Sequence, residues 1–131
     1  MIGLDTNVLV RYIMQDDAKQ AALATKLIDA LTPQAPGFVP MVALVELVWV
    51  LSGSFDLQRA QIADAIEALL RSKEMVVERA ETVWQALRLF RSGSADFANG
   101  LIERSAAAAG CERTLTFDRA AAKGCGMTLV Q

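Results

Sequence analysis

The chain has 131 residues, the length of one domain, and 13 basic against 15 acidic residues give it a net charge of −2. It contains no histidine, which excludes Ser-His-Asp and Cys-His catalysis and histidine-bound zinc. Cys111 and Cys125 are too few for a metal knuckle, so we expect two small buried hydrophobic residues. Hydrophobic residues make up 53% of the chain, which is ample material for a core.

The composition gives no indication of a membrane or secreted protein. The chain lacks the basic region and cleavable apolar stretch of a signal peptide. Its longest apolar run, Met41–Leu51, is interrupted by Glu46 and is too short to cross a membrane. We therefore expect a soluble cytoplasmic protein without a membrane partner. The nearly balanced charge neither indicates nor excludes a nucleic-acid partner.

The first third of the chain alternates short apolar runs with helical patterns. Residues 1–4 predict a strand that ends at Asp5, and apolar residues at helical spacing then predict a first helix. A second helix is predicted over Ala18–Leu31, with Leu23 and Leu27 on the same side as residues 28 and 31. Phe38–Val39 predicts a short strand that ends at a proline.

The rest of the chain continues the alternation. Helices are predicted over residues 41–51, 57–71, 81–91, 96–109 and 119–123, and strands over residues 75–78, 114–117 and 127–130. No hairpin pattern occurs, so the strands are joined by crossovers and a parallel sheet is expected. We predict an α/β fold in a single domain over residues 1–131.

Glu46 is the most informative single residue. The residues that share its helical face are apolar, and its helix contains no Lys or Arg. A lone ionised carboxylate on an apolar face is costly, and such groups concentrate at functional sites. The alternatives are a helix face that touches water and a salt bridge to a distant Arg. Trp49 and Trp84 fall on apolar stripes and are predicted to lie in the core.

Three aspartates precede predicted helices: Asp5, Asp96 and Asp118. Each could simply cap its helix. However, Asp5 and Asp118 also follow strands, and the carboxyl edge of a parallel sheet is where ligands bind. Convergence of these three acids with Glu46 would be untenable for bare anions, because two charges about 4 Å apart repel by roughly 4 kcal/mol at a dielectric of about 20.

A cluster of this kind would bind protons or a divalent cation. An oxygen-only pocket suits Mg²⁺ or Mn²⁺, and such an ion can activate a water and clamp a phosphoryl oxygen. This chemistry predicts hydrolysis of a phosphodiester.

Two other functions fit parts of the pattern. Asp5 could be the nucleophile of a phosphotransfer or phosphatase domain, although the fourth strand ends in Asp118 rather than in the Lys that such sites usually contain. Alternatively, the acidic pocket could belong to a non-catalytic module that receives a basic partner peptide.

Four segments resemble the acidic motifs of one family, in order and over essentially the whole chain. Residues 2–11, which read Ile-Gly-Leu-Asp-Thr-Asn-Val-Leu-Val-Arg, resemble the opening of PIN-domain proteins, and most closely the VapC-type ribonuclease toxins of toxin–antitoxin pairs. The other three segments are Val45-Glu46, residues 94–99 and residues 114–118.

The resemblance implies a three-layer α/β sandwich with a parallel five-stranded sheet in the order 3-2-1-4-5. It implies an endoribonuclease that depends on Mg²⁺ or Mn²⁺ and acts on structured RNA such as tRNA. It also implies an antitoxin protein that blocks the site, and a toxin homodimer. By this resemblance the catalytic set is Asp5, Glu46, Asp96 and Asp118, in which the three aspartates hold the metal and Glu46 completes the shell or orients the attacking water.

The resemblance also assigns supporting residues. Thr6 and Asn7 would orient Asp5 or its waters. Asn99 stands where many VapC-type toxins have a second Asp, so we expect one well-occupied metal and a second that is recruited only with substrate. Arg11, Arg119 and Lys123 could hold RNA phosphates, or they could be ordinary solvated charges.

Overall fold

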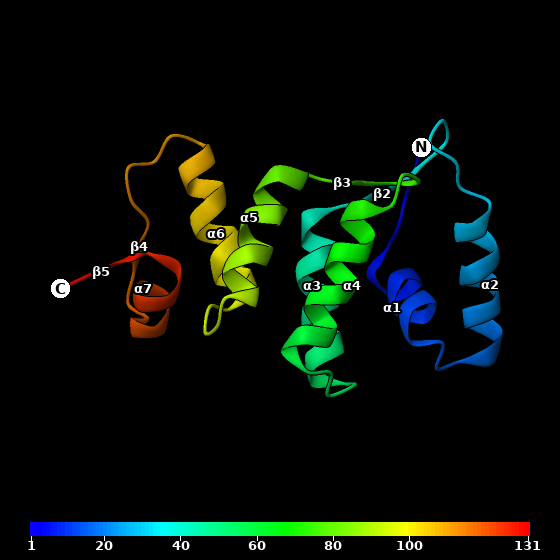
Figure 1. Ribbon diagram of the computed structural model, residues 1–131, viewed down its shortest axis with the longest axis horizontal. Helices are drawn as coiled ribbons and strands as arrows, with labels where there is room; N and C mark the ends of the chain where they lie inside the picture. Colours follow the sequence, from blue (N-terminus) through cyan, green and yellow to red (C-terminus); the bar gives the residue numbers. More distant parts are fainter. The chain divides into compact units, whose positions relative to one another are not determined.

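The computed structural model describes residues 1–131 and contains seven helices and five short strands (Figure 1). The chain divides into two compact units, Met1–Glu78 and Arg79–Gln131, which are described separately below. None of the helices combines the length and apolar character that a bilayer crossing requires.

The first unit is built on a parallel three-stranded sheet. Its strands are β1 (Ile2–Gly3), β2 (Gly37–Val39) and β3 (Met75–Val77), in the order β1-β2-β3. Gly37 permits a close approach at the centre of this sheet, because a Cβ there would lie 2.8 Å from the Leu4 side chain. The chain leaves β1 directly into the segment that begins with Asp5.

Four helices complete the first unit: α1 (Thr6–Met14), α2 (Ala18–Asp29), α3 (Met41–Gly53) and α4 (Arg59–Arg71). The helix α1 packs against both α2 and α3, and α4 packs against α3 and β3 (Figure 1). Fully buried side chains hold these elements together, among them Leu9 of α1, Leu44 and Leu47 of α3 and Ile66 of α4. The packing of α1 on α3 brings the first two acidic segments together.

The second unit contains α5 (Ala80–Arg91), α6 (Phe97–Ala108), β4 (Leu115–Thr116), α7 (Arg119–Cys125) and β5 (Thr128–Leu129). The helices α5 and α6 pack along each other, and Phe90 meets Phe97 edge to face with 5.9 Å between ring centroids. β4 and β5 form a parallel two-stranded sheet.

The α/β class, the element order and the parallel pairing predicted from the sequence are confirmed. The predicted five-stranded sheet in the order 3-2-1-4-5 is not confirmed: the strands form a three-stranded sheet, β1-β2-β3, and a two-stranded sheet, β4-β5, each within its own unit. Four of the strands are shorter than predicted, whereas β2 is one residue longer than the predicted Phe38–Val39.

The burial predictions for Trp49 and Cys111 were wrong, and α2 does not bury the side that carries Leu23 and Leu27. Leu23 is 61% exposed and Leu27 is also exposed, because α2 buries its small residues Ala21 and Ala24 together with Ile28. Trp49 is 62% exposed, since α3 is apolar on every side and buries the opposite face; Trp84 is half-buried. Cys111 is exposed in the turn that follows α6, whereas Cys125 is buried as predicted.

Candidate active site

Asp5 is the N-cap of α1. It has extended backbone angles, and its Oδ1 accepts a hydrogen bond from the Thr6 backbone N–H at 2.7 Å. The cap satisfies one of the free N–H groups at the start of the helix. The second carboxylate oxygen accepts no hydrogen bond and is available to a ligand. Capping and chemistry can therefore be combined in this side chain.

Thr6 connects Asp5 to Glu46. Its side chain is buried, and its Oγ1 donates a hydrogen bond to Oε1 of Glu46 at 2.6 Å. Glu46 lies on α3, so this bond spans two helices that the sheet and core hold in register. The hydroxyl thus fixes one oxygen of Glu46 and leaves the other without a hydrogen bond. Thr6 was predicted to orient Asp5 or its waters; its backbone N–H contacts Asp5, and its hydroxyl holds Glu46.

The burial argument for Glu46 was wrong, although its predicted neighbourhood with Asp5 is present. Glu46 is exposed, and so are Val42 and Trp49 on the same face of α3. The side chain is also not unpaired, because Thr6 donates to it. The residue is therefore singled out by its position near Asp5 rather than by the cost of burying a charge.

A cavity of about 490 Å³ gathers these groups on the first unit. It is lined by Asp5, Thr6, Asn7, Val10, Arg11, Asp16, Glu46, Val50, Ser54 and Phe55. Three of these side chains are carboxylates and one is basic. The cavity therefore contains every site residue that the sequence predicted in this unit.

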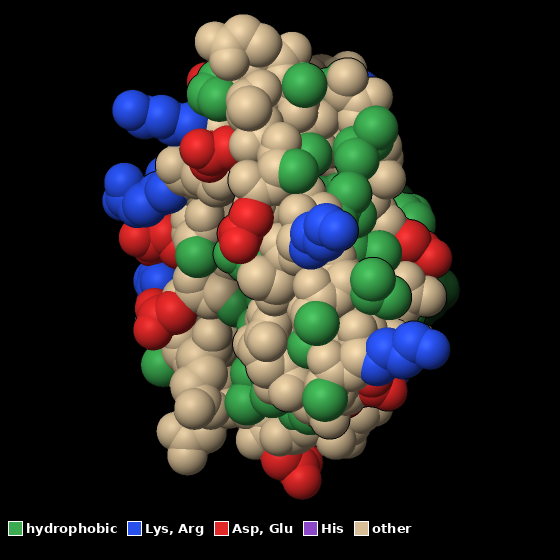
Figure 2. All heavy atoms as spheres, turned by 90° about the vertical axis from the view of Figure 1, so that its right-hand side faces the viewer, with side chains coloured by type: hydrophobic (Ala, Val, Ile, Leu, Met, Phe, Trp, Pro, Cys, Tyr) green, Lys and Arg blue, Asp and Glu red, His purple; other side chains and the backbone are tan.

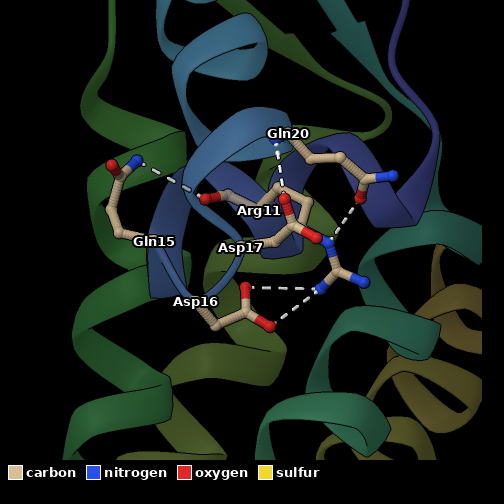
Figure 3. Close-up of polar contacts among 5 residues, drawn as sticks. All are labelled: Arg11, Gln15, Asp16, Asp17 and Gln20. Carbon is tan, nitrogen blue, oxygen red and sulfur yellow. Dashed lines mark hydrogen bonds and ion pairs between the residues drawn. The ribbon is translucent and has the colours of Figure 1, made fainter.

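Asp16 is the one carboxylate of this cavity that the sequence did not predict as a site residue. Of the adjacent Asp16 and Asp17, only Asp17 caps α2, by accepting from the Gln20 backbone N–H at 2.9 Å. Asp16 instead accepts from the Arg11 guanidinium at 3.1 Å (Figure 3). The cue in the sequence is that only one residue can be the N-cap, which leaves the other acid free to pair with the helix before it.

In the second unit, both predicted site aspartates also cap helices. Asp96 is the N-cap of α6, and its Oδ2 accepts from the Asn99 backbone N–H at 3.0 Å. Asp118 is the N-cap of α7, and its Oδ1 accepts from the backbone N–H groups of Ala120 and Ala121 at 2.8 and 3.3 Å. Each acid therefore commits one oxygen to a cap and keeps a second oxygen for another partner. The half-buried Asn99 lies one turn beyond Asp96.

Asp96 and Asp118 lie around the same buried thiol. Burial raises the pKa of Cys125, and the negative charges of Asp96, Glu103 and Asp118 raise that pKa further, while a backbone hydrogen bond with Asp96 opposes them. Gly124 allows α7 to approach the segment before α6, because a Cβ there would lie 3.4 Å from the Ala95 Cα. The second unit thus brings its two predicted site acids into one neighbourhood.

The remaining predicted residues lie on the surface of α7. Arg119 begins this helix and Lys123 lies in its last turn, and both are exposed. Neither forms an ion pair. Both are exposed cations on the helix that Asp118 caps, and their role as phosphate contacts stays a prediction.

The profile of the PIN-domain family matches residues 2–126 of this chain. The chain belongs to the PIN-domain family. PIN domains are typically nucleases, they act on RNA, and they generally use divalent metal ions. The match extends over both compact units and includes all of the acids described above. Comparisons with curated proteins and with solved structures gave no match.

The candidate ligands of this PIN domain are of a chemical type that suits a divalent metal ion. The candidate ligands are carboxylates with open oxygens, without imidazole or thiolate, which is the set that hard divalent cations prefer. Within either unit alone, no three acidic or thiol side chains are grouped closely enough to hold an ion.

Proposed function

We propose that this PIN domain is an endoribonuclease that hydrolyses RNA phosphodiesters with Mg²⁺ or Mn²⁺. The observation that carries the proposal is the cavity in which Asp5 and the Thr6-bound Glu46 lie together, in a chain that matches the PIN family. Cavities with fixed carboxylates and open oxygens suit metal-assisted hydrolysis. The phosphotransfer alternative has no comparable support, since no Lys lines the cavity.

The proposed site unites Asp5, Glu46, Asp96 and Asp118 in one pocket of a single domain over residues 1–131. The four-residue set and the five-stranded order 3-2-1-4-5 rest on the resemblance of the four acidic segments to those of VapC-type toxins.

In this site Asp5, Asp96 and Asp118 would hold the metal ion. A bound ion would supply Lewis-acid chemistry toward the phosphoryl group. Glu46 would orient the attacking water through its second oxygen, because Thr6 holds the first. Asn7 and Asn99 offer neutral oxygens at the rim, so we expect one well-occupied metal and a second that binds with substrate. In the reaction, water adds to phosphorus as the bond from phosphorus to the leaving oxygen breaks, and one proton of the water ends on that leaving oxygen.

The biological role that we propose is that of a cytoplasmic toxin of the VapC type. Its substrate would be tRNA or another structured RNA, its partner an antitoxin protein that covers the acidic pocket, and its working form a homodimer. The support is the resemblance of the four acidic segments, in order, to those of such toxins.

Cleavage of a labelled structured RNA by the purified chain tests the activity. We expect cleavage in Mg²⁺ or Mn²⁺ and none in EDTA, and a loss of at least a hundredfold in Asp5→Asn. The matched control is Asp17→Asn, which alters another helix-capping aspartate of the same unit that does not line the cavity. Metal-independent cleavage, or equal rates for Asp5→Asn and its parent, would contradict the proposal.

A further inference from the structure

The first unit holds one arginine in a fixed position at the wall of the acidic cavity. We infer that Arg11 is a contact for an RNA phosphate and that Asp16 and Gln20 are the positioning residues that fix it. This inference rests on the proposed function, and it adds to it a substrate-binding device within the same cavity.

The guanidinium of Arg11 is held from two elements. Its Nε donates to Oε1 of Gln20 on α2 at 2.8 Å, and its Nη1 donates to both oxygens of Asp16 at 3.1 and 3.3 Å (Figure 3). Asp16 belongs to the short link between α1 and α2, so three consecutive parts of the chain meet at this side chain. Its Nη2 makes no hydrogen bond, and the side chain is 30% exposed. Arg11 is therefore ordered and still has a donor to offer.

The charges around Arg11 indicate which kind of group its free donor would bind. Arg11 is the only basic residue that lines the cavity, and Asp5, Asp16 and Glu46 line it too. A phosphate entering such a cavity meets repulsion from the acids, and Arg11 is the protein's own compensating charge. Arginine binds phosphate oxygens through hydrogen bonds as well as through charge.

The face over α2 shows no broad basic patch. Acidic and basic side chains are interspersed there rather than gathered by sign (Figure 2). RNA binding therefore cannot depend on a broad basic patch of this face. A single guanidinium in a fixed position is then an important contact for holding the RNA backbone in register.

Asp16 provides a test in which two explanations differ in sign. An acid near the substrate path weakens the binding of a polyanion, so its removal would tighten RNA binding if charge alone mattered. If Asp16 acts by holding Arg11, its removal weakens RNA binding instead. The chain also contains a matched ion pair, Arg71 with Glu67, which lies on α4 in the same unit and does not line the cavity.

The experiment measures kcat and KM for cleavage of a labelled RNA hairpin in Mg²⁺ at several KCl concentrations. The single variants are Arg11→Ala, Arg11→Lys, Asp16→Ala and Gln20→Ala. A double variant combines Arg11→Ala with Asp16→Ala, and the controls are Arg71→Ala and Glu67→Ala. We expect Arg11→Ala to raise KM about tenfold with little change in kcat, and to reduce the slope of log KM against log salt by about one. Arg11→Lys retains the charge without the fork and should give an intermediate KM.

The positioning role makes its own predictions. Asp16→Ala should raise KM severalfold, Gln20→Ala should do so to a smaller extent, and adding Asp16→Ala to Arg11→Ala should raise KM no further. Both control variants should stay within about twofold of the parent. Any of three results would overturn the inference: an unchanged KM in Arg11→Ala, a lowered KM in Asp16→Ala, or an effect of Asp16→Ala that persists when Arg11 is absent. None of these results would contradict the proposed nuclease activity. A parent chain that cleaves no RNA would instead overturn the proposed function, and this inference with it.

Discussion

The hydroxyl of Thr6 lies 2.6 Å from Oε1 of Glu46 and joins positions 40 residues apart in the chain. The backbone N–H of the same threonine donates to Asp5 at 2.7 Å. One buried residue thus fixes the carboxylates of two acidic motifs, one through its amide and the other through its side chain. Glu46 is exposed, one of its oxygens is held by Thr6, and its side chain lines the same cavity as Asp5.

Substituting Thr6 with Val tests this relationship. Val preserves the shape and the backbone bond to Asp5 but removes the hydroxyl, and a hydrogen bond to a charged group contributes about 1.5–3 kcal/mol. We expect RNA cleavage to slow by about tenfold or more in single-turnover assays, whereas Thr6→Ser should retain most of the rate. Equal rates for Thr6→Val and the parent would show that Glu46 does not need its donor.

The three capping aspartates allow stability to be separated from chemistry. Asn caps helices about as well as Asp, so Asp5→Asn, Asp96→Asn and Asp118→Asn should each change the free energy of unfolding by less than about 0.5 kcal/mol. Each should nevertheless reduce cleavage by at least a hundredfold. Denaturant unfolding and cleavage rates measured on the same preparations check this.

The control for that series is Asp17→Ala, which removes a cap without touching the cavity. It should destabilise the protein by about 1 kcal/mol and leave the cleavage rate unchanged. If the three Asn variants lost stability and kept activity, these acids would be caps alone.

Asn99 can be used to probe the metal content. It is half-buried one turn beyond Asp96 and provides an amide where an acid would add charge. We expect Asn99→Asp to lower the Mg²⁺ concentration at half-maximal cleavage by severalfold, because a further carboxylate strengthens a site for hard cations. A higher Mg²⁺ requirement would place Asn99 away from the metal.

The two cysteines should differ in reactivity. Cys111 is exposed, whereas Cys125 is buried and has a raised pKa, chiefly because of burial, so little of it is thiolate at neutral pH. A thiol reagent should therefore modify Cys111 rapidly and Cys125 only after unfolding. Mass spectrometry of partially labelled protein identifies the modified residue, and early labelling of Cys125 would contradict the packing of α7.

Gly100 offers a test of the packing between α5 and α6. A Cβ there would lie 3.6 Å from the Ala86 Cβ, which is an ordinary contact, and Gly is a weak helix former. We expect Gly100→Ala to stabilise the protein by up to about 1 kcal/mol, seen as a higher Tm. A lower Tm would show that α6 cannot accommodate the methyl group.

The sequence predicted the order of elements because each helix carries its own start and stop. The capping aspartates and Pro40 mark where α3, α6 and α7 begin, and these depend on local geometry alone. The predicted parallel topology also placed Asp5 near Glu46, because adjacent parallel strands and their crossovers allow few other arrangements. Both residues line the same cavity.

What the sequence could not predict depends on tertiary packing. The helix α3 is apolar all round, so its pattern did not show that Trp49 faces outward. The pairing of Arg11 with Asp16 is a contact across a helix end, which no periodicity describes. The partner of Thr6 is likewise fixed by how α1 packs on α3.

Crystals of the protein grown with Mn²⁺ test the central claim most directly, because the ion is located by its anomalous scattering and its ligands can be read off. We expect one Mn²⁺ bound through carboxylate oxygens at about 2.2 Å, with Asp5 from the first unit and Asp96 and Asp118 from the second around the same ion. An ion held by acids of one unit only, with the others out of reach, would contradict the single four-acid site and the nuclease built on it.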